Sequence, residues 1–199
     1  MPELNKSIFR EYDIRGIVPD ELNEDTISKI AKSIALKCHK ESVDEIVIGR
    51  DGRLSGPTLL DSLQESLNKN GINTINIGLV TSPLLYYAAK KIASKSGIML
   101  TGSHNPKNYN GIKLVIDDKP VSGTEIWAFS QMDTGLECAN GSNVFLDVKD
   151  NYIEEVANCF SFEKLKVVVD CGNGAAGIIA PDLLRAVGCE VIELFCDVD

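Results

Sequence analysis

Apolar residues recur along this chain with two different spacings, and the two spacings alternate. Apolar side chains three or four residues apart are typical of a helix with one buried face, whereas short continuous or alternating apolar runs are typical of strands. The helical spacing covers residues 24–37, 58–71, 83–92, 151–160 and 180–188. The strand pattern covers residues 45–49, 72–79, 97–102, 112–117, 166–170 and 189–195. This alternation predicts an α/β fold, with a layered mixed sheet and helices on both faces.

Residues that favour helix ends stand where the periodic segments begin and stop. Asn23 precedes the first predicted helix and suits an N-cap, and Gly71 follows the second and suits a C-terminal cap. Pro83 opens the third, where its missing N–H costs nothing. The segment 118–149 is less regular. It predicts a turn at 118–123, a short helix at 125–132 capped by Thr124, and a loop at 136–143.

A second strand–helix–strand unit starts near residue 165. It runs from the strand at 166–170 through a glycine-rich turn to the strand at 189–195. A lone unit of this kind can hardly bury both faces of its strands. We therefore expect a complete first domain over residues 1–145 and the truncated start of a second α/β domain over residues 146–199.

Composition and charge narrow the class of partner. Twenty basic and 29 acidic residues give a net charge of −9, which disfavours binding to nucleic acid or to an anionic membrane. The sequence shows neither a signal peptide nor an apolar run long enough to cross a membrane, so we expect a cytoplasmic protein. Its six cysteines and two histidines lack the spacing of a metal site, and we expect the cysteines to be reduced.

The densest group of reactive residue types is LTGSHNPKNYNGIKL, residues 100–114. It follows a predicted strand, and ligands of α/β sheets gather at loops beyond the carboxyl ends of strands. Gly102 permits a close backbone approach, while Asn105-Pro106 and Asn110-Gly111 predict tight turns on either side. A second loop with the same placement is GRDGRLSGP, residues 49–57, where Arg50 and Arg53 could meet phosphate or, as we favour, pair with Asp51.

Ser103 admits three interpretations. As an acyl-transfer nucleophile it would need a base, and only His39 or the adjacent His104 is available; a sequence neighbour rarely reaches back with suitable geometry. As a phosphoryl carrier it would gain strong acceptor oxygens, which Lys113, His104 and loop N–H groups could hold. The third interpretation is a solvated polar turn.

Four motifs now resemble one family. FREYDIRG (9–16), GRDGRLSGP (49–57), TGSHNP followed by NYNGIKL (101–114) and VVVDCGNGAAGIIAPDLLRAVGC (167–189) occur in this order. They are similar to the landmarks of the phosphohexomutases, the family of bacterial phosphoglucomutases and phosphomannomutases, over its N-terminal part.

The resemblance implies an intramolecular phosphotransferase that interconverts the 1- and 6-phosphates of mannose, glucose or both. Ser103 matches the phosphoserine, and a hexose 1,6-bisphosphate is the intermediate and activator. Mg²⁺ would bind the phosphate on Ser103. His104 and Lys113 match catalytic positions, and Arg15 matches a catalytic residue that, like Tyr12 and Lys113, binds the sugar phosphate. Because phosphoryl transfer needs positive charge where charge develops, a lysine, an arginine and a metal suit it. A structural salt bridge for Arg15 and core packing for Tyr12 are the alternatives.

The chain also departs from the family pattern. It lacks the family's Asp-Gly-Asp-x-Asp-Arg metal loop and its sugar-selecting and phosphate-binding loops, so we expect the 199-residue chain to be inactive alone. A first alternative is a non-enzymatic fragment that binds a sugar phosphate or a protein partner. A second is a dinucleotide-binding protein, because GNGAAG (172–177) matches G-x-G-x-x-G and Glu190 or Glu193 follows at about the expected interval. Pro181 disfavours the second alternative, since it falls where the helix of that motif is well under way.

Overall fold

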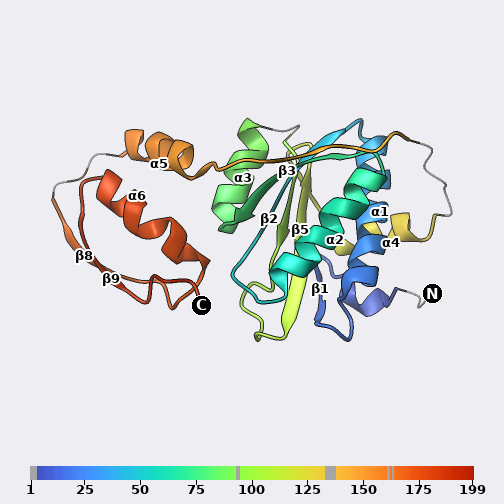
Figure 1. The fold of residues 1–199 in the computed structure, drawn as a ribbon, viewed down its shortest axis with the longest axis horizontal. Helices are drawn as coiled ribbons and strands as arrows, with labels where there is room; N and C mark the ends of the chain where they lie inside the picture. Colours follow the sequence, from blue (N-terminus) through green and yellow to red (C-terminus); the bar gives the residue numbers. More distant parts are fainter. Residues whose placement is uncertain (1–3, 93–94, 133–137, 161, 163) are drawn as a thin grey trace.

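One mixed seven-stranded sheet organises the first part of the chain (Figure 1). The structure, a computed structural model, describes residues 4–92, 95–132, 138–160, 162 and 164–199. The strands are β1 (Ile14–Ile17), β2 (Glu45–Arg50), β3 (Asn73–Leu79), β4 (Gly97–Leu100), β5 (Tyr109–Ile116), β6 (Lys119–Val121) and β7 (Asn143–Phe145). Their order is β1-β5-β4-β2-β3-β7, with β6 paired to β5. The pairs β2–β3, β2–β4 and β3–β7 are parallel, and β5 runs antiparallel to β1, β4 and β6.

Helices cover both faces of this sheet, as the sequence predicts. The helices are α1 (Glu24–Lys40), α2 (Gly56–Lys69), α3 (Ser82–Lys91) and α4 (Gly123–Ser130), with a 3₁₀ turn η1 (Lys6–Ile8) before β1. The isoleucines of α1 and the leucines of α2 pack on Ile46, Ile48 and Ile98, and Ile126 of α4 joins them. On the opposite face, α3 packs on a second cluster that includes Val47 and Met99. Alternate residues of β2 and β4 therefore serve two cores.

The predicted helix ends are confirmed at the first two helices. The Asn23 side chain accepts a hydrogen bond from the Thr26 N–H at 3.0 Å and caps α1. Gly71, one residue beyond the C-cap of α2, has φ +82°, a conformation that glycine adopts without strain.

The predicted turn at Asn110-Gly111 is wrong. Both residues lie inside β5, which begins at Tyr109, three residues earlier than predicted. Gly111 stands opposite Arg15 of β1, and a Cβ there would lie 2.3 Å from the Ile14 carbonyl oxygen. Asn110 is fully buried and donates to Ser55 Oγ at 2.9 Å. The Asn-Gly pair therefore serves close strand packing and not chain reversal.

The segment 118–149 is more regular than predicted. Residues 119–121 form β6, so only Asp117 and Asp118, both with positive φ, turn the chain. The predicted cap Thr124 is also wrong: the Ser122 Oγ accepts from the Glu125 N–H at 3.1 Å and caps α4. Of the predicted loop at 136–143, residues 136 and 137 lie outside the described residues and Asn143 begins β7.

The second strand–helix–strand unit follows helix α5 (Lys149–Asn158). It contains β8 (Lys166–Asp170), a 3₁₀ turn η2 (Ala175–Ile178), α6 (Ala180–Ala186) and β9 (Glu190–Leu194). The two strands pair in parallel as a separate sheet, and this unit lies to one side of the first sheet (Figure 1). Helix α5 contacts α3 through Tyr152 and Tyr87, whose ring centroids are 5.1 Å apart.

Candidate active site

Ser103 lies at the carboxyl end of β4, on an exposed loop that leads to β5. Its backbone takes φ +51°, a left-handed conformation that is uncommon for a residue other than glycine. The Ser103 N–H donates to Thr101 Oγ1 at 2.8 Å, and that hydroxyl donates to Asp51 Oδ2 at 2.6 Å. Because β2 and β4 are parallel neighbours, the loop after β2 supplies Asp51 at the same edge of the sheet.

Arg53 binds the serine loop from the side of β2. Its guanidinium donates to the carbonyl oxygens of Ser103, Asn105, Pro106 and Tyr109, at 3.0, 2.7, 2.6 and 2.9 Å. Its Nε pairs with Asp51 Oδ2 at 3.3 Å, as we favoured, whereas among the described residues the Arg50 side chain donates to the Asp51 backbone carbonyl and not to its carboxylate. A Cβ on Gly102 would lie 2.2 Å from the Arg53 Cζ, so this packing requires glycine.

Arg15 reaches the same loop from β1. Only 5% of its side chain is exposed, and it forms an ion pair with Asp13. Its Nη1 donates to the Gly102 carbonyl at 3.0 Å and to Asn105 Oδ1 at 2.6 Å. Its Nε is buried without a hydrogen-bond partner among the described residues. The structural salt bridge that we named as an alternative is thus present, and the guanidinium lies against the backbone of the serine loop.

His104 approaches Ser103 more closely than adjacent residues usually do. The His104 Nδ1 lies 3.4 Å from Ser103 Oγ, and both side chains are exposed. A contact of this length is a long hydrogen bond that a small rotation can shorten. Adjacent residues rarely reach back with the geometry of a catalytic base, and here the His104 ring lies at the long end of hydrogen-bond distance from Ser103.

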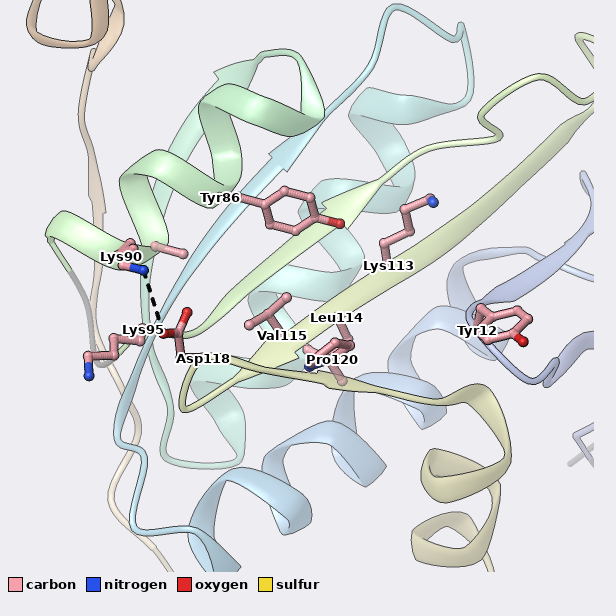
Figure 2. A pocket seen from close by; sticks show the side chains of 10 residues that line it. Tyr12, Tyr86, Lys90, Lys95, Lys113, Leu114, Val115, Asp118 and Pro120 are labelled. Atoms are coloured by element: carbon pink, nitrogen blue, oxygen red, sulfur yellow. Dashed lines mark ion pairs between the residues drawn. The ribbon is translucent and has the colours of Figure 1, made fainter. Parts of the chain in front are cut away.

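Lys113 and Tyr12 line a different cavity from Ser103, with a volume of about 340 Å³. Figure 2 shows Lys113 on β5 beside Tyr86 of α3, with Tyr12 further away on the same side as Lys113. Tyr12 is 82% exposed, so the alternative of core packing is wrong for it. Lys113 stands opposite Met99 of β4, and Met99 also lines the cleft beside Ser103. The two cavities thus share one face of the sheet.

The cleft beside Ser103 is larger, about 990 Å³, and brings together segments that are far apart in sequence. Its walls are the loop after β2 (51–54), the start of α3, the serine loop and the glycine-rich turn at 172–175. Gly172 and Asn173 in that turn have positive φ. From sequence alone, Ser103 and this turn are expected in different domains, and no motif indicates that they face one cleft.

The glycine-rich turn differs from a dinucleotide site in the element that comes after it. The dinucleotide motif requires a helix whose N-terminus begins at the glycines. Here the 3₁₀ turn η2 comes first, and α6 begins only at Ala180 with Pro181 in its first turn. Gly177 is the last glycine of GNGAAG, and a Cβ there would lie 1.9 Å from the Cys196 carbonyl oxygen. Close packing against the backbone therefore explains this glycine without a bound dinucleotide.

The described residues do not fit a complete Mg²⁺ site. They contain no group of three or more His, Cys, Asp or Glu side chains that could hold a metal ion. Asp51, the carboxylate nearest to Ser103 in the loop network, is already bound by Thr101 and Arg53. Mg²⁺ needs several oxygen ligands in octahedral geometry, and a phosphate on Ser103 would supply only one group of them.

Within the described residues, no helix is long and apolar enough to cross a membrane.

Comparisons with known proteins agree with the motifs. Residues 6–126 match the family model "Phosphoglucomutase/phosphomannomutase, alpha/beta/alpha domain I". The phosphomannomutase/phosphoglucomutase of Pseudomonas syringae is 46% identical over 201 residues, which cover 100% of this chain and 43% of that protein. The phosphoglucomutase of Neisseria gonorrhoeae is 38% identical and is covered to 44%. A crystal structure of a phosphoglucomutase/phosphomannomutase family protein from Burkholderia thailandensis superposes with a TM-score of 0.92 at 36% identity, over 99% of this chain and 45% of that one. The chain thus spans less than half the length of the relatives that it matches.

Proposed function

This chain belongs to the phosphoglucomutase/phosphomannomutase family, and we propose that it carries the phosphoserine of a phosphohexomutase. The enzyme would interconvert hexose 1-phosphate and hexose 6-phosphate of mannose, glucose or both, through a hexose 1,6-bisphosphate. One observation carries the proposal. Ser103 is exposed at the rim of a cleft of about 990 Å³, and its own backbone is held in a left-handed conformation. A covalent carrier needs a hydroxyl that is both accessible and fixed.

The transfer step uses groups that lie around this loop. The bond between phosphorus and Ser103 Oγ breaks, and a hydroxyl oxygen of the sugar monophosphate forms the new bond to phosphorus. The hydroxyl proton passes to a base, and Ser103 Oγ takes up a proton. His104, with its Nδ1 3.4 Å from Ser103 Oγ, is our candidate for proton transfer. The reverse transfer from the other position of the bisphosphate restores the phosphoserine.

Lys113, Tyr12 and Arg15 are proposed to act on the sugar phosphate. Lys113 and Tyr12 line one cavity on the sheet face that also bears Met99, beside the cleft of Ser103. A lysine ammonium stabilises negative charge that develops on phosphoryl oxygens. The Arg15 Nη1 is already engaged with Gly102 and Asn105, so a phosphate would be bound through the Nε–H, which has no partner among the described residues, or by exchange of these contacts. We also keep the division into a domain of residues 1–145 and the start of a second domain at 146–199 as a proposal.

Phosphopeptide mass spectrometry of the chain tests this function directly. The purified chain is incubated with glucose 1,6-bisphosphate and Mg²⁺, and a Ser103→Ala chain is treated in parallel. We expect one phosphate on the wild-type chain, on Ser103, and none on the variant. An unmodified Ser103, with binding of sugar phosphate retained, would replace this proposal with the non-enzymatic binding function.

A further inference from the structure

Arg53 uses every hydrogen-bond donor of its side chain on the serine loop and its support. A guanidinium has five N–H groups in a fixed planar arrangement. Arg53 makes five contacts, with four loop carbonyl oxygens and with Asp51 Oδ2. We propose that Arg53 is a positioning residue that fixes the Ser103 loop in its transfer-competent conformation. This inference rests on the proposed function of Ser103.

The neighbourhood of Arg53 is built for this contact. Its side chain is only 13% exposed, although it belongs to a surface loop. The Arg53 N–H donates to Asp51 Oδ1 at 3.1 Å, while Asp51 Oδ2 accepts from Thr101 at 2.6 Å. Asp51 therefore links the Arg53 backbone to Thr101, the first residue of the serine loop. Gly102 leaves room for the guanidinium to lie against the loop backbone.

The direction of the loop carbonyls has a consequence for phosphate. Because a trans peptide group is planar, the N–H that follows a carbonyl points the opposite way. The Ser103 and Pro106 carbonyls face Arg53, so the N–H groups of His104 and Lys107 face away from it. Neither N–H donates a hydrogen bond to another described residue. Arg53 thus holds the loop with these two backbone donors unpaired within the described residues, and in the proposed role they would donate to oxygens of a phosphoryl group on Ser103.

The same contacts indicate that Arg53 does not itself bind the phosphate. With five donors and five acceptors already in contact, the guanidinium has no N–H left for a substrate. Replacing Arg53 should therefore lower the rate at which Ser103 is phosphorylated when the phosphoryl donor is saturating. The concentration of phosphoryl donor that gives half of the maximal rate should stay unchanged. A lysine has three donors on one nitrogen and cannot span the same set of carbonyls.

Two measurements on Arg53→Gln and Arg53→Lys chains test the inference. The first is the rate of trypsin cleavage after Lys107, which is exposed in the serine loop. We expect it to rise about tenfold or more in both variants, because cleavage follows the population of the open loop. The second is the rate of Ser103 phosphorylation by glucose 1,6-bisphosphate at saturating donor. We expect it to fall about a hundredfold, the scale of a displaced reacting group.

Arg185→Gln is the matched control, since it removes an arginine with two acidic partners from α6, outside the cleft. It should leave both rates unchanged, and circular dichroism should show that all variants are folded. Unchanged cleavage after Lys107 in the Arg53 variants would overturn the inference, as would faster cleavage with normal phosphorylation. If the wild-type chain is not phosphorylated at all, the proposed function of Ser103 fails, while the cleavage rates still decide whether Arg53 fixes the loop.

Discussion

Gly111 and Ser103 show two ways in which single residues shape this site. Gly111 has no side chain because β1 passes too close for one, with the Ile14 carbonyl 2.3 Å and the Thr101 carbonyl 3.1 Å from where a Cβ would lie. Ser103 has a side chain although its backbone is left-handed, a conformation that costs roughly 1–2 kcal/mol for an L-residue. The loop contacts of Arg53, Arg15 and Thr101 offset that cost.

Gly111→Ala should destabilise the first sheet by about 3 kcal/mol, because backbone on the neighbouring strand cannot move aside cheaply. Gly172→Ala is its matched control. A Cβ at Gly172 meets nothing within 4 Å, and only its φ of +53° opposes a side chain. The control should cost about 1 kcal/mol. Urea unfolding measures both free energies, and equal losses for the two variants would contradict the role assigned to Gly111.

The residue scale is also where sequence reasoning was least reliable. Asn110-Gly111 has the sequence of a turn, and only the approach of β1, almost a hundred residues earlier in the chain, makes it part of a strand. The error at Thr124 was avoidable. Ser122 and Glu125 stand three residues apart, the Ser-x-x-Glu spacing of a capping box. The contacts of Arg53 with the serine loop span about 50 residues and left no local signal.

At the scale of elements, helices and strands could be predicted from the sequence where the apolar residues recur with a single helical or strand spacing. Helices α1, α2 and α3 and strands β2 and β3 were predicted to within a few residues, because each turns an apolar face to a core. Helix α6 and strands β8 and β9 were predicted as closely from their apolar runs, although most of their side chains are exposed or only partly buried. Strand β7 was missed. It is three residues long and exposed, and the residue before it is held by Asn73 Oδ1, which accepts from the Ser142 N–H at 2.8 Å and from Ser142 Oγ at 2.9 Å.

The parallel pair of β8 and β9 brings two cysteines together just beyond its carboxyl end. Cys171 Sγ and Cys196 Sγ are 3.5 Å apart, next to the glycine-rich turn that lines the cleft. Burial, together with the neighbouring Cys196 thiol, raises the pKa of the Cys171 thiol to about 11. Because the thiolate is the reactive form, this favours the reduced state at neutral pH.

Oxidised glutathione should link these two cysteines, giving one protein disulfide and two molecules of reduced glutathione. Below the thiol pKa the thiolate fraction rises with pH, so the rate should increase about tenfold per pH unit between about pH 7 and pH 8.5. Non-reducing peptide mapping would identify the pair by its loss of two hydrogen atoms. Cys196→Ser should abolish the link, and a disulfide that joins other cysteines first would contradict the geometry.

At the scale of the whole molecule, the position of the second unit was beyond sequence reasoning. Helix α5 is joined to α3 by Tyr152 against Tyr87 and by Glu155, which pairs with Lys91 at 2.7 Å. These contacts link residues more than 60 positions apart on two amphipathic helices, either of which could have turned that face to solvent. They help to bring the turn at 172–175 to the cleft of Ser103, which makes the cleft a product of both units.

Phosphorylation of Ser103 requires only that the serine is accessible, whereas mutase turnover requires a complete active site. We therefore expect the two activities to differ in this chain. A polypeptide of these 199 residues should have negligible mutase turnover, even if Ser103 accepts a phosphoryl group. The described residues offer no group of metal ligands, and positioning of both phosphates can account for roughly 7–11 kcal/mol of the barrier. The assay converts glucose 1-phosphate to glucose 6-phosphate with Mg²⁺ and glucose 1,6-bisphosphate present, and it detects the product with a dehydrogenase. Turnover that also appears with Ser103→Ala would come from a contaminating enzyme. Robust turnover that Ser103→Ala abolishes would show that these residues alone build a working site.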